Sequence, residues 1–461
     1  MRAYQYDFST PTAQGLSIDA FTLPKALPHV LPGAALSPLH EDLGDVARAV
    51  TVTDRFSPRH RDGDHTDART LHLTLPVRCP DVWQQQAVTA ALQHTLDFLT
   101  QDQWHLTFVP RSRLAPSSQS EQILLAHTAS AVELAFSLYS GGADSTMGVT
   151  LQGLLRPAVR QVVIAATGGH LAQQQNLAFD HVSDELERRG AQRLIGVPFK
   201  TRVNRQAVGV MQGIDPDKRV PEDYSQRSRG FLFIALGAMV AASNGATALH
   251  VYENGPGAIN LPYSRASIGA DHTRSMHPRF LTLMQGFLEA LLGQPFAIRN
   301  PHWFETKSEM ARRVAEAGLA HLIPDTLSCE RFNTRATGPR TEGQGVHCGA
   351  CTSCLLREVS FRHARVSDST YTSTLEDLQG DDRKWFTLMR DQAQMLHAAT
   401  NGPGDAFLNL MKGFPDLRYA FDGLRLLGFM PDDTRAGLVR LYRQYASEWQ
   451  SVTNTSAALP A

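Results

Sequence analysis

Strands and helices alternate in the hydrophobic pattern of the middle of the chain. Short apolar runs are each followed by stretches in which apolar residues return every three or four positions, which is the period of a helix. The strand candidates are residues 131–138, 162–165, 194–197, 248–252 and 296–298, and helices are expected near residues 178–190, 230–242 and 280–292. This alternation predicts a parallel sheet with helices on both faces, whose ligands would bind at the carboxyl ends of the strands.

The pattern differs on either side of this segment. Residues 1–70 are rich in Pro and turn formers, and residues 57–65 are expected to form an exposed loop. Further on, a helix opened by a capping box of Asp81 and Gln84 is expected between two strands. After about residue 366 the apolar period is helical. We therefore predict three regions: an N-terminal α+β extension (1–130), an α/β core (131–365) and a helical C-terminal region (366–461).

Composition narrows the class of protein. The 461 residues include 44 Lys plus Arg and 45 Asp plus Glu, and a net charge near zero argues against a broad nucleic-acid-binding surface. No apolar run approaches the roughly 20 residues needed to cross a membrane. The first residues carry an early acid, Asp7, and no apolar signal core. The simplest expectation is a cytoplasmic protein with no membrane partner.

A glycine-rich loop, residues 140–145, follows the first core strand and opens a helix. Its sequence is Ser-Gly-Gly-Ala-Asp-Ser. Glycines allow a tight turn and a close approach of the backbone, and the free N–H groups of a helix N-terminus attract anions. The Gly-Lys-Ser/Thr ending of a Walker loop is absent. The loop therefore suits a pyrophosphate leaving group better than a transferring γ-phosphate, although an ordinary strand-to-helix turn is the bland alternative.

Residues 136–146 resemble the PP-loop of the N-type ATP pyrophosphatases. As a class, these enzymes cleave ATP between the α and β phosphates and adenylate their substrate. The resemblance implies ATP and Mg²⁺ as cofactors, with Ser140, Asp144 and Ser145 in catalytic roles. The ATP-binding residues that it implies are Leu138, Tyr139, Ser140, Gly141, Gly142, Ala143, Asp144, Ser145 and Thr146, with Thr167 at the end of the second core strand.

Four of the five cysteines fall within 26 residues: Cys329, Cys348, Cys351 and Cys354. In a long chain without a signal peptide, such clustering indicates a metal rather than disulfides. Two short intervals and one distant thiolate fit a closed tetrahedral Zn²⁺ site. His347 is an alternative ligand, and an iron–sulfur cluster is an alternative occupant. The fifth cysteine, Cys79, is expected to be a buried small hydrophobe.

The cysteine segment refines the resemblance. Residues 328–330 and 348–357 are similar to the zinc segment of the QueC family, and Thr306-Lys307-Ser308-Glu309 resembles that family's Thr-Lys-x-Glu segment. The resemblance covers about residues 131–365. It implies an ATP-dependent carbon–nitrogen ligase that converts a 7-carboxy-7-deazaguanine to a nitrile with ammonia. Lys307 would then be a further catalytic residue, because it could balance phosphate charge.

The chain departs from the family's usual pattern in two places. Residues 271–280 stand where the family has a Tyr-Pro-Asp-Cys-Arg stretch, and residues 252–257 replace its Gly-x-Asn-x-x-Asp. These differences, and the extensions at both ends, make the chain look like the QueC-like proteins of bacterial anti-phage systems, such as QatC. The candidate substrate contacts are Arg229, Glu253, Asn254 and Arg274.

Three functions are compatible with these features. The first is a defence-associated enzyme that adenylates a deazapurine carboxylate and joins it to an amine, with an amide, a nitrile or a nucleobase–protein conjugate as product. The second is a housekeeping 7-cyano-7-deazaguanine synthase of queuosine biosynthesis, and the third is a nucleotide-binding interaction module without turnover. The extensions are expected to recognise a protein partner from the same operon, or else to cover the core or form a homodimer.

Overall fold

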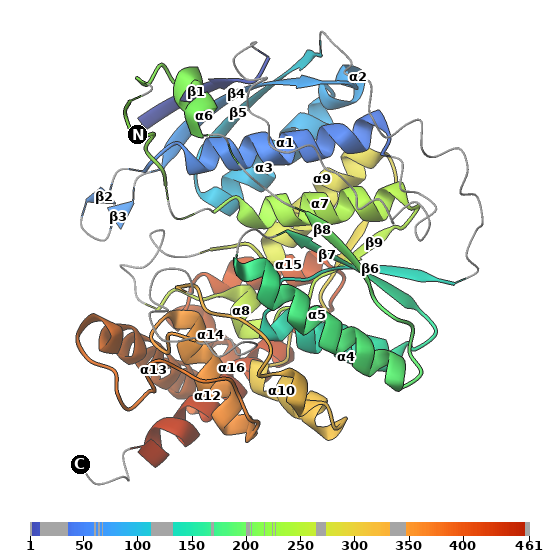
Figure 1. The fold of residues 1–461 in the computed structure, drawn as a ribbon. Helices are drawn as coiled ribbons and strands as arrows, with labels where there is room; N and C mark the ends of the chain where they lie inside the picture. The colour runs from blue at the N-terminus through green and yellow to red at the C-terminus, as the bar shows by residue number, and fades with distance from the viewer. Residues whose placement is uncertain are drawn as a thin grey trace.

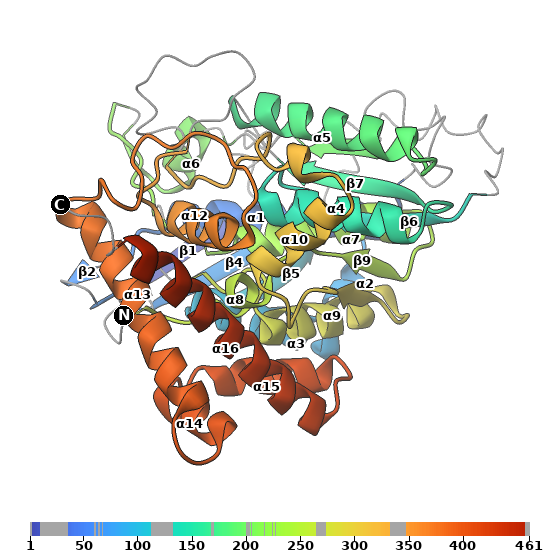
Figure 2. The same ribbon diagram turned by 90° about the horizontal axis from the view of Figure 1, so that it is seen from below.

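The computed structural model describes residues 2–9, 36–59, 61–62, 65–66, 68–111, 132–166, 170–199, 203, 205–215, 217–223, 225, 227–263, 273–331 and 347–456. These residues form stacked layers (Figure 1). The N-terminal sheet lies at one end, followed by two layers of helices, the central sheet and a last layer of helices. The C-terminal helices lie beside the lower layers, near one end of the central sheet (Figure 2).

The central sheet is parallel, as the alternating pattern predicts. Its strands are β6 (Leu134–Leu138), β7 (Arg160–Ala166), β8 (Ile195–Phe199), β9 (Ala248–His250) and β10 (Ala297–Arg299), and their spatial order is β10-β9-β6-β7-β8. The chain runs from β6 outward to β8 and then returns to β9 on the other side of β6. The order therefore reverses between β6 and β9, and ligands of open parallel sheets bind at such a switch point.

Helices cover both faces of the central sheet. On one face lie α4 (Ala143–Leu155) and α5 (His170–Arg188), and on the other lie α7 (Arg229–Ser243) and α9 (Pro278–Leu292) (Figure 1). Helix α7 is apolar almost all round, because it is packed between the sheet and the N-terminal region. The remaining core helices are α6 (Arg205–Met211), α8 (Gly255–Ile259), α10 (Lys307–Glu316), η5 (Ala320–Leu322) and α12 (Thr352–Ala364).

The N-terminal region contains a parallel sheet of its own. Its order is β1-β4-β5, with bounds Arg2–Asp7, Arg69–Val77 and Gln103–Pro110. Helices α1 (Pro38–Arg55), α2 (Pro80–Trp83) and α3 (Gln86–Thr100) accompany it, with a two-stranded ribbon of β2 (Arg61–Asp62) and β3 (His65–Thr66). Helix α1 packs on α7 and α3 packs on α9, so the region covers one face of the core (Figure 1).

Helix α1 forms within the stretch that is rich in Pro and turn formers, because its apolar residues pack against α7. Two expectations for the N-terminal region were wrong. The expected capping box does not form: the chain makes the short helix α2 first, and the Gln84 amide donates to the carbonyl of Phe108 at 2.9 Å. Cys79 is only half-buried, and its N–H donates to Asp42 Oδ2 at 2.9 Å.

The segment expected to be an exposed loop carries a buried cation instead. Arg59 is 7% exposed, and its Nη2 lies 2.5 Å from Asp102 Oδ2 and 3.3 Å from Asp54 Oδ1. Arg69 shares the same two acids, each at 2.6 Å. Two buried arginines are tolerated here because three buried carboxylates face them: Asp54, Asp102 and Asp223, whose Oδ1 lies 3.3 Å from Arg59 Nη1. The network also reaches the core, since Asp54 Oδ2 accepts from the N–H of Ser228, the residue before α7, at 2.8 Å.

The C-terminal region is helical, as predicted. Its helices are α13 (Gly380–Asn401), α14 (Ala406–Gly413), α15 (Leu417–Leu426) and α16 (Pro431–Ser456). Helix α16 packs against α12 and α13, and α15 packs against α9. None of the helices in the described ranges is long and apolar enough to span a membrane.

Replacing Asp102 with Ala should strongly destabilise the protein. The substitution leaves Arg69 with Asp54 as its remaining acid and Arg59 with the more distant Asp54 and Asp223, and removing one partner of a buried pair costs about 3–5 kcal/mol. Urea denaturation would measure the change in the free energy of unfolding. Glu133→Ala is the control, because the Arg156–Glu133 pair is exposed and should contribute less than about 1 kcal/mol. Equal losses in the two variants would contradict a structural role for the buried network.

Candidate active site and metal centre

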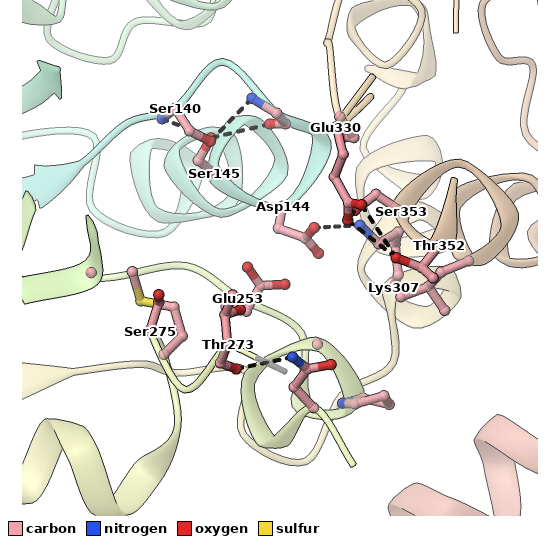
Figure 3. Close-up of a pocket in the computed structure, with 18 of the residues that line it drawn as sticks. Ser140, Asp144, Ser145, Glu253, Thr273, Ser275, Lys307, Glu330, Thr352 and Ser353 are labelled. Carbon is pink, nitrogen blue, oxygen red and sulfur yellow. Dashed lines mark hydrogen bonds and ion pairs between the residues drawn. The ribbon is translucent and has the colours of Figure 1, made fainter. Parts of the chain in front are cut away.

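A cavity of about 900 Å³ lies at the carboxyl ends of β6 and β9. The phosphate loop after β6 forms one wall, and residues 251–257, which follow β9, form another. The cysteine segment and the C-terminal helices close other sides. The predicted site and the switch point of the sheet therefore coincide (Figure 3).

The phosphate loop has the geometry of an anion cradle. Gly141 has φ +73°, and a Cβ there would lie 2.9 Å from the Cα of Gln175, so only glycine fits. Gly142 is the N-cap of α4 and has no side chain to satisfy the first N–H groups of the helix. The hydroxyl oxygens of Ser140 and Ser145 lie 3.1 Å apart at this helix end (Figure 3). Backbone and hydroxyl donors thus converge where a phosphate could bind.

The loop residues do not all face the cavity. Those that line it are Leu138, Tyr139, Ser140, Gly142, Asp144 and Ser145. Thr146, a predicted ATP contact, is turned away, and its hydroxyl lies 3.2 Å from the hydroxyl of the buried Tyr139. The Ala143 N–H is engaged by Ser328 Oγ at 3.2 Å. Thr167, the last predicted ATP contact, lies outside the described residues.

Asp144 and Lys307 form a buried ion pair beside the loop. Lys307 is 6% exposed and Asp144 is 8% exposed, and the Lys307 ammonium contacts Asp144 Oδ2. Lys307 is the first residue of α10, whose N-cap Thr306 makes a capping box with Glu309. The pair therefore joins the first turns of α4 and α10 (Figure 3). Sequence reasoning selected both residues, but only the fold places them in contact.

Asn254 orients the two acids of the site. Its amide nitrogen donates to Asp144 Oδ1 at 3.0 Å and to Glu253 Oε1 at 2.9 Å, and its Oδ1 accepts from the N–H of Gly257. Asn254 is fully buried and is not among the residues that line the cavity. The contacts of Asn254, predicted to meet the substrate, are thus with the two acids and with the backbone of Gly257.

Glu253 faces the cavity beside Asp144. Loss of solvent around the carboxylate, together with repulsion from Asp144, raises the pKa of Glu253 to about 8, and Lys307 opposes part of that rise. The group is therefore largely protonated at neutral pH in the ligand-free protein. A cation bound between the two carboxylates would favour the ionised form.

Two of the arginines near α7 lie at the cavity. Arg229 lines it, is exposed, and has no ion-pair partner within the described ranges. Its guanidinium lies 5.0 Å from the ring centre of Phe233. Arg227 is buried, donates to the carbonyl of Thr100 at 3.0 Å, and has a pKa lowered to about 10 by burial and by Arg59. Arg229 is therefore the cation best placed for an anionic ligand.

Arg274, which was expected to contact substrate, lies away from the cavity. It is not among the residues that line the cavity. Its guanidinium lies 4.6 Å from the ring centre of Phe98 and 5.6 Å from that of Tyr419, and it donates to the carbonyl of Phe98. Arg274 thus joins α3 to α15 by cation–π contacts. Its neighbours Thr273 and Ser275 line the cavity instead (Figure 3).

The four clustered cysteines converge as a metal site requires. Their Sγ atoms all lie within 4.8 Å of one another, and all four residues are buried. The N–H groups of Ala350 and Cys351 donate to Cys348 Sγ at 3.4 and 3.3 Å, which stabilises a thiolate. Gly349 has φ +76°, and a Cβ there would lie 1.7 Å from the carbonyl oxygen of Ser373. A set of four thiols with this spacing fits tetrahedral Zn²⁺.

His347 does not belong to this set. Its Nε2 accepts from the N–H of Ser328 at 3.1 Å, and its Nδ1 lies 2.7 Å from Ser369 Oγ. Both ring nitrogens are engaged, so the alternative of a histidine ligand is excluded.

The metal segment also holds the phosphate loop. The N–H of Leu327 donates to the carbonyl of Gly141 at 3.0 Å, and Ser328 Oγ accepts from the N–H of Ala143. Arg357, in the helix that follows the cysteines, donates to Ser328 Oγ at 3.2 Å and pairs with Asp368. A few hydrogen bonds therefore connect the cysteine cluster to the phosphate loop, so a change in the cluster should also disturb the loop.

Sequence reasoning missed one wall of the cavity. This wall comes from the C-terminal helices and one residue after α8, and its members are Tyr263, Trp385, Gln392, Tyr442 and Tyr445. No motif marks these residues, since aromatic residues at helical spacing are equally typical of a packed core. Glu330, which accepts from Thr352 and Ser353, also lines the cavity and carried no separate signal (Figure 3).

The geometry of the cavity indicates the class of enzyme. A phosphate loop without a Walker lysine, at the switch point of a parallel sheet, is the nucleotide site of a PP-loop enzyme. A sequence model of the family described as "Queuosine biosynthesis protein QueC" matches residues 134–365, about half of the chain. The chain therefore belongs to the QueC family, whose members are ATP-using enzymes.

Two curated relatives agree with this assignment. The 7-cyano-7-deazaguanine synthase of Ruegeria sp. (strain TM1040) is 28% identical over 195 residues, which are 40% of this chain and 73% of that protein. The 7-cyano-7-deazaguanine synthase of Rhizorhabdus wittichii is 30% identical over 167 residues, which are 35% of this chain and 60% of that protein. The regions outside the match are large, so the resemblance concerns the core.

Cys351→Ser should lower both the metal content and the stability of the protein. We expect about one zinc per chain in the wild type, because four convergent thiolates make a closed tetrahedral site. Elemental analysis and thermal unfolding would measure the two effects, and Cys79→Ser is the matched control. Metal-free protein with full thermal stability would refute the assignment of zinc to this cluster.

Proposed function

We propose that the protein adenylates the carboxylate of a 7-deazaguanine-type substrate with ATP and transfers the acyl group to an amine. The observation that supports this most is the placement of Arg229, an arginine without an ion-pair partner in the described part of the chain, in the same cavity as the phosphate loop. The loop suits pyrophosphate, and Arg229 suits the carboxylate that must approach the α-phosphate. The names of the two curated relatives favour a deazaguanine substrate.

The reaction divides into two displacements. A carboxylate oxygen attacks the α-phosphorus of ATP, the bond to the bridging oxygen breaks, and pyrophosphate leaves. The amine nitrogen then attacks the carbonyl carbon of the acyl adenylate, loses a proton, and AMP leaves with the electron pair of the broken bond. Both steps depend on alignment and on stabilisation of charge more than on proton transfer.

Each part of the cavity has a task in this proposal. The N–H groups that follow Ala143 in the first turn of α4 and the hydroxyls of Ser140 and Ser145 hold the pyrophosphate as charge develops on it. Arg229 orients the substrate carboxylate. Lys307, already anchored by Asp144, adds positive charge beside the phosphates. These are fixed donors, so they need no rearrangement when the reaction occurs.

Mg²⁺ fits the acids of the site. Asp144 and Glu253 both offer carboxylate oxygens to the cavity, and Asn254 fixes their orientation. Hard oxygen ligands of this kind suit Mg²⁺, which would supply charge neutralisation on the phosphates when bound. Zn²⁺ has a structural task in this proposal: the cysteine cluster holds the segment that contacts the phosphate loop.

Two candidates remain for the product of the reaction and for its biological role. We propose a role in anti-phage defence, with an amide or a nucleobase–protein conjugate as product and a protein from the same operon as partner. The departures from the family pattern and the folded extensions favour this candidate. The second is 7-cyano-7-deazaguanine synthase activity, which the names of both relatives favour. The mass of the product distinguishes an amide, a nitrile and a modified protein.

AMP and pyrophosphate should be the nucleotide products. The protein would be incubated with ATP, a deazapurine acid and either ammonia or the candidate partner, and all small-molecule and protein products would be measured by mass spectrometry. Asp144→Ala and Ser140→Ala should each lower turnover by at least tenfold while zinc stays bound, because neither residue contacts the cysteine cluster. Release of ADP and phosphate alone would contradict adenylation.

Mg²⁺-dependent nucleotide affinity should rise between pH 6.5 and 8.5. The pKa of Glu253 is about 8 in the free protein, so the ion must displace a proton from it at lower pH. Because the folded-state pKa lies above the unfolded value, Glu253 costs stability as the pH rises toward 8. Glu253→Gln should therefore stabilise the free protein in this range and flatten the pH dependence. Titration calorimetry with and without Mg²⁺ would measure the nucleotide affinity at each pH. The same pH dependence in Glu253→Gln and the wild type would contradict a contact between Glu253 and the ion.

A further inference from the structure

One face of α16 is directed at the start of α10. Arg440, Gln444 and Glu448 lie four residues apart along α16, so they share one side of the helix. Arg440 pairs with Glu309 and donates to the carbonyl of Phe304 at 2.6 Å. Gln444 donates to Glu448 Oε1 at 3.1 Å. These three side chains of α16 therefore lie along the segment that contains Lys307.

Glu448 contacts the residues on both sides of Lys307. Glu448 is 1% exposed, and its Oε1 accepts from Thr306 Oγ1 at 2.6 Å and from the hydroxyl of Ser308. Thr306 is the N-cap of α10, and Ser308 is fully buried. The carboxylate thus fixes the neighbours of Lys307, while the Lys307 ammonium reaches Asp144 on the opposite side.

Burying a carboxylate between two helices costs free energy, because the group loses its hydration. An apolar side chain of similar size would pack between α16 and α10 without the loss of hydration that an acid suffers. Burial does raise the pKa of Glu448 to about 7, while the bonds from Ser308 and Thr306 oppose the rise. The carboxylate fixes the orientation of Thr306 and Ser308, because both hydroxyl groups must point at the same oxygen.

We propose that Glu448 is a positioning residue for Lys307: it fixes the first turn of α10 so that the ammonium of Lys307 stays against Asp144 at the phosphate loop. Helix α16 lies outside residues 134–365, the segment that matches the QueC family. The C-terminal region thus completes the active site of the core. The kinetic part of this inference rests on the proposed function, whereas the geometric part does not.

Three substitutions on α16 separate positioning from packing. Glu448→Leu removes the acceptor, and Glu448→Gln keeps a carbonyl oxygen that can still accept. Arg443→Met is the matched control, because Arg443 lies on the same helix and donates to the carbonyl of Thr400 in α13 at 2.6 Å. All three would be measured as full-length protein, with zinc content as a check of folding.

The first measurement is the reactivity of Lys307 toward an amine-directed acylating reagent, quantified by mass spectrometry of its peptide. Glu448→Leu should increase labelling of Lys307 at least threefold, and Glu448→Gln and Arg443→Met should stay within about 1.5-fold of the wild type. The second measurement is steady-state kinetics. Glu448→Leu should lower kcat at least tenfold with less than a twofold change in KM for the acid, and Glu448→Gln should recover most of kcat.

The outcomes distinguish this inference from the proposed function. Unchanged labelling of Lys307 in Glu448→Leu, or an equal increase in Arg443→Met, overturns the positioning role. Equal loss of kcat in Glu448→Gln and Glu448→Leu also overturns it, because the retained acceptor would then have no effect. If the wild type shows no adenylation but labelling responds as described, the positioning role is supported and the proposed reaction is the part that fails.

Discussion

The contact between Lys307 and Asp144 is the constraint around which the site is built. Both charges are largely removed from water, so each depends on the other for compensation. The pair fixes the first turn of α10 against the first turn of α4, which is also the anion-binding end of the phosphate loop. Asn254, from the neighbouring wall, holds the remaining oxygen of Asp144.

Three other parts of the chain hold these two helix ends or the start of α7. The cysteine segment holds the phosphate loop through Leu327 and Ser328, the N-terminal region fixes the start of α7 through Asp54, and α16 fixes the start of α10 through Glu448. The extensions therefore cover the core and help to build its cavity. Removing either one would expose apolar helices as well as disturb the site, so point substitutions test their roles more cleanly than truncations.

The distribution of charge in the cavity follows a simple division. Asp144, on α4, and Glu253, after β9, share the amide of Asn254, and Lys307 is paired with Asp144. Arg229, which has no ion-pair partner among the residues that the structure describes, lies at the start of α7 on another side. The acids could bind Mg²⁺ together with the phosphates of ATP, and Arg229 could bind the carboxylate of the substrate on another side of the same cavity. The proposed adenylation requires both groups to be bound at once.

The sequence by itself determined the parallel sheet, the phosphate loop and the cysteine cluster, because periodicity, glycines and ligand spacing are local properties of the chain. It also selected Asp144, Glu253 and Lys307 as site residues. Only the tertiary structure decided that Asn254 faces the acids, that Arg274 stacks on Phe98 and that Thr146 turns to Tyr139. It alone brought Glu448 to Thr306, 142 positions away along the chain. Such contacts depend on how distant helices pack, and no local pattern encodes the partner that a buried polar group will find.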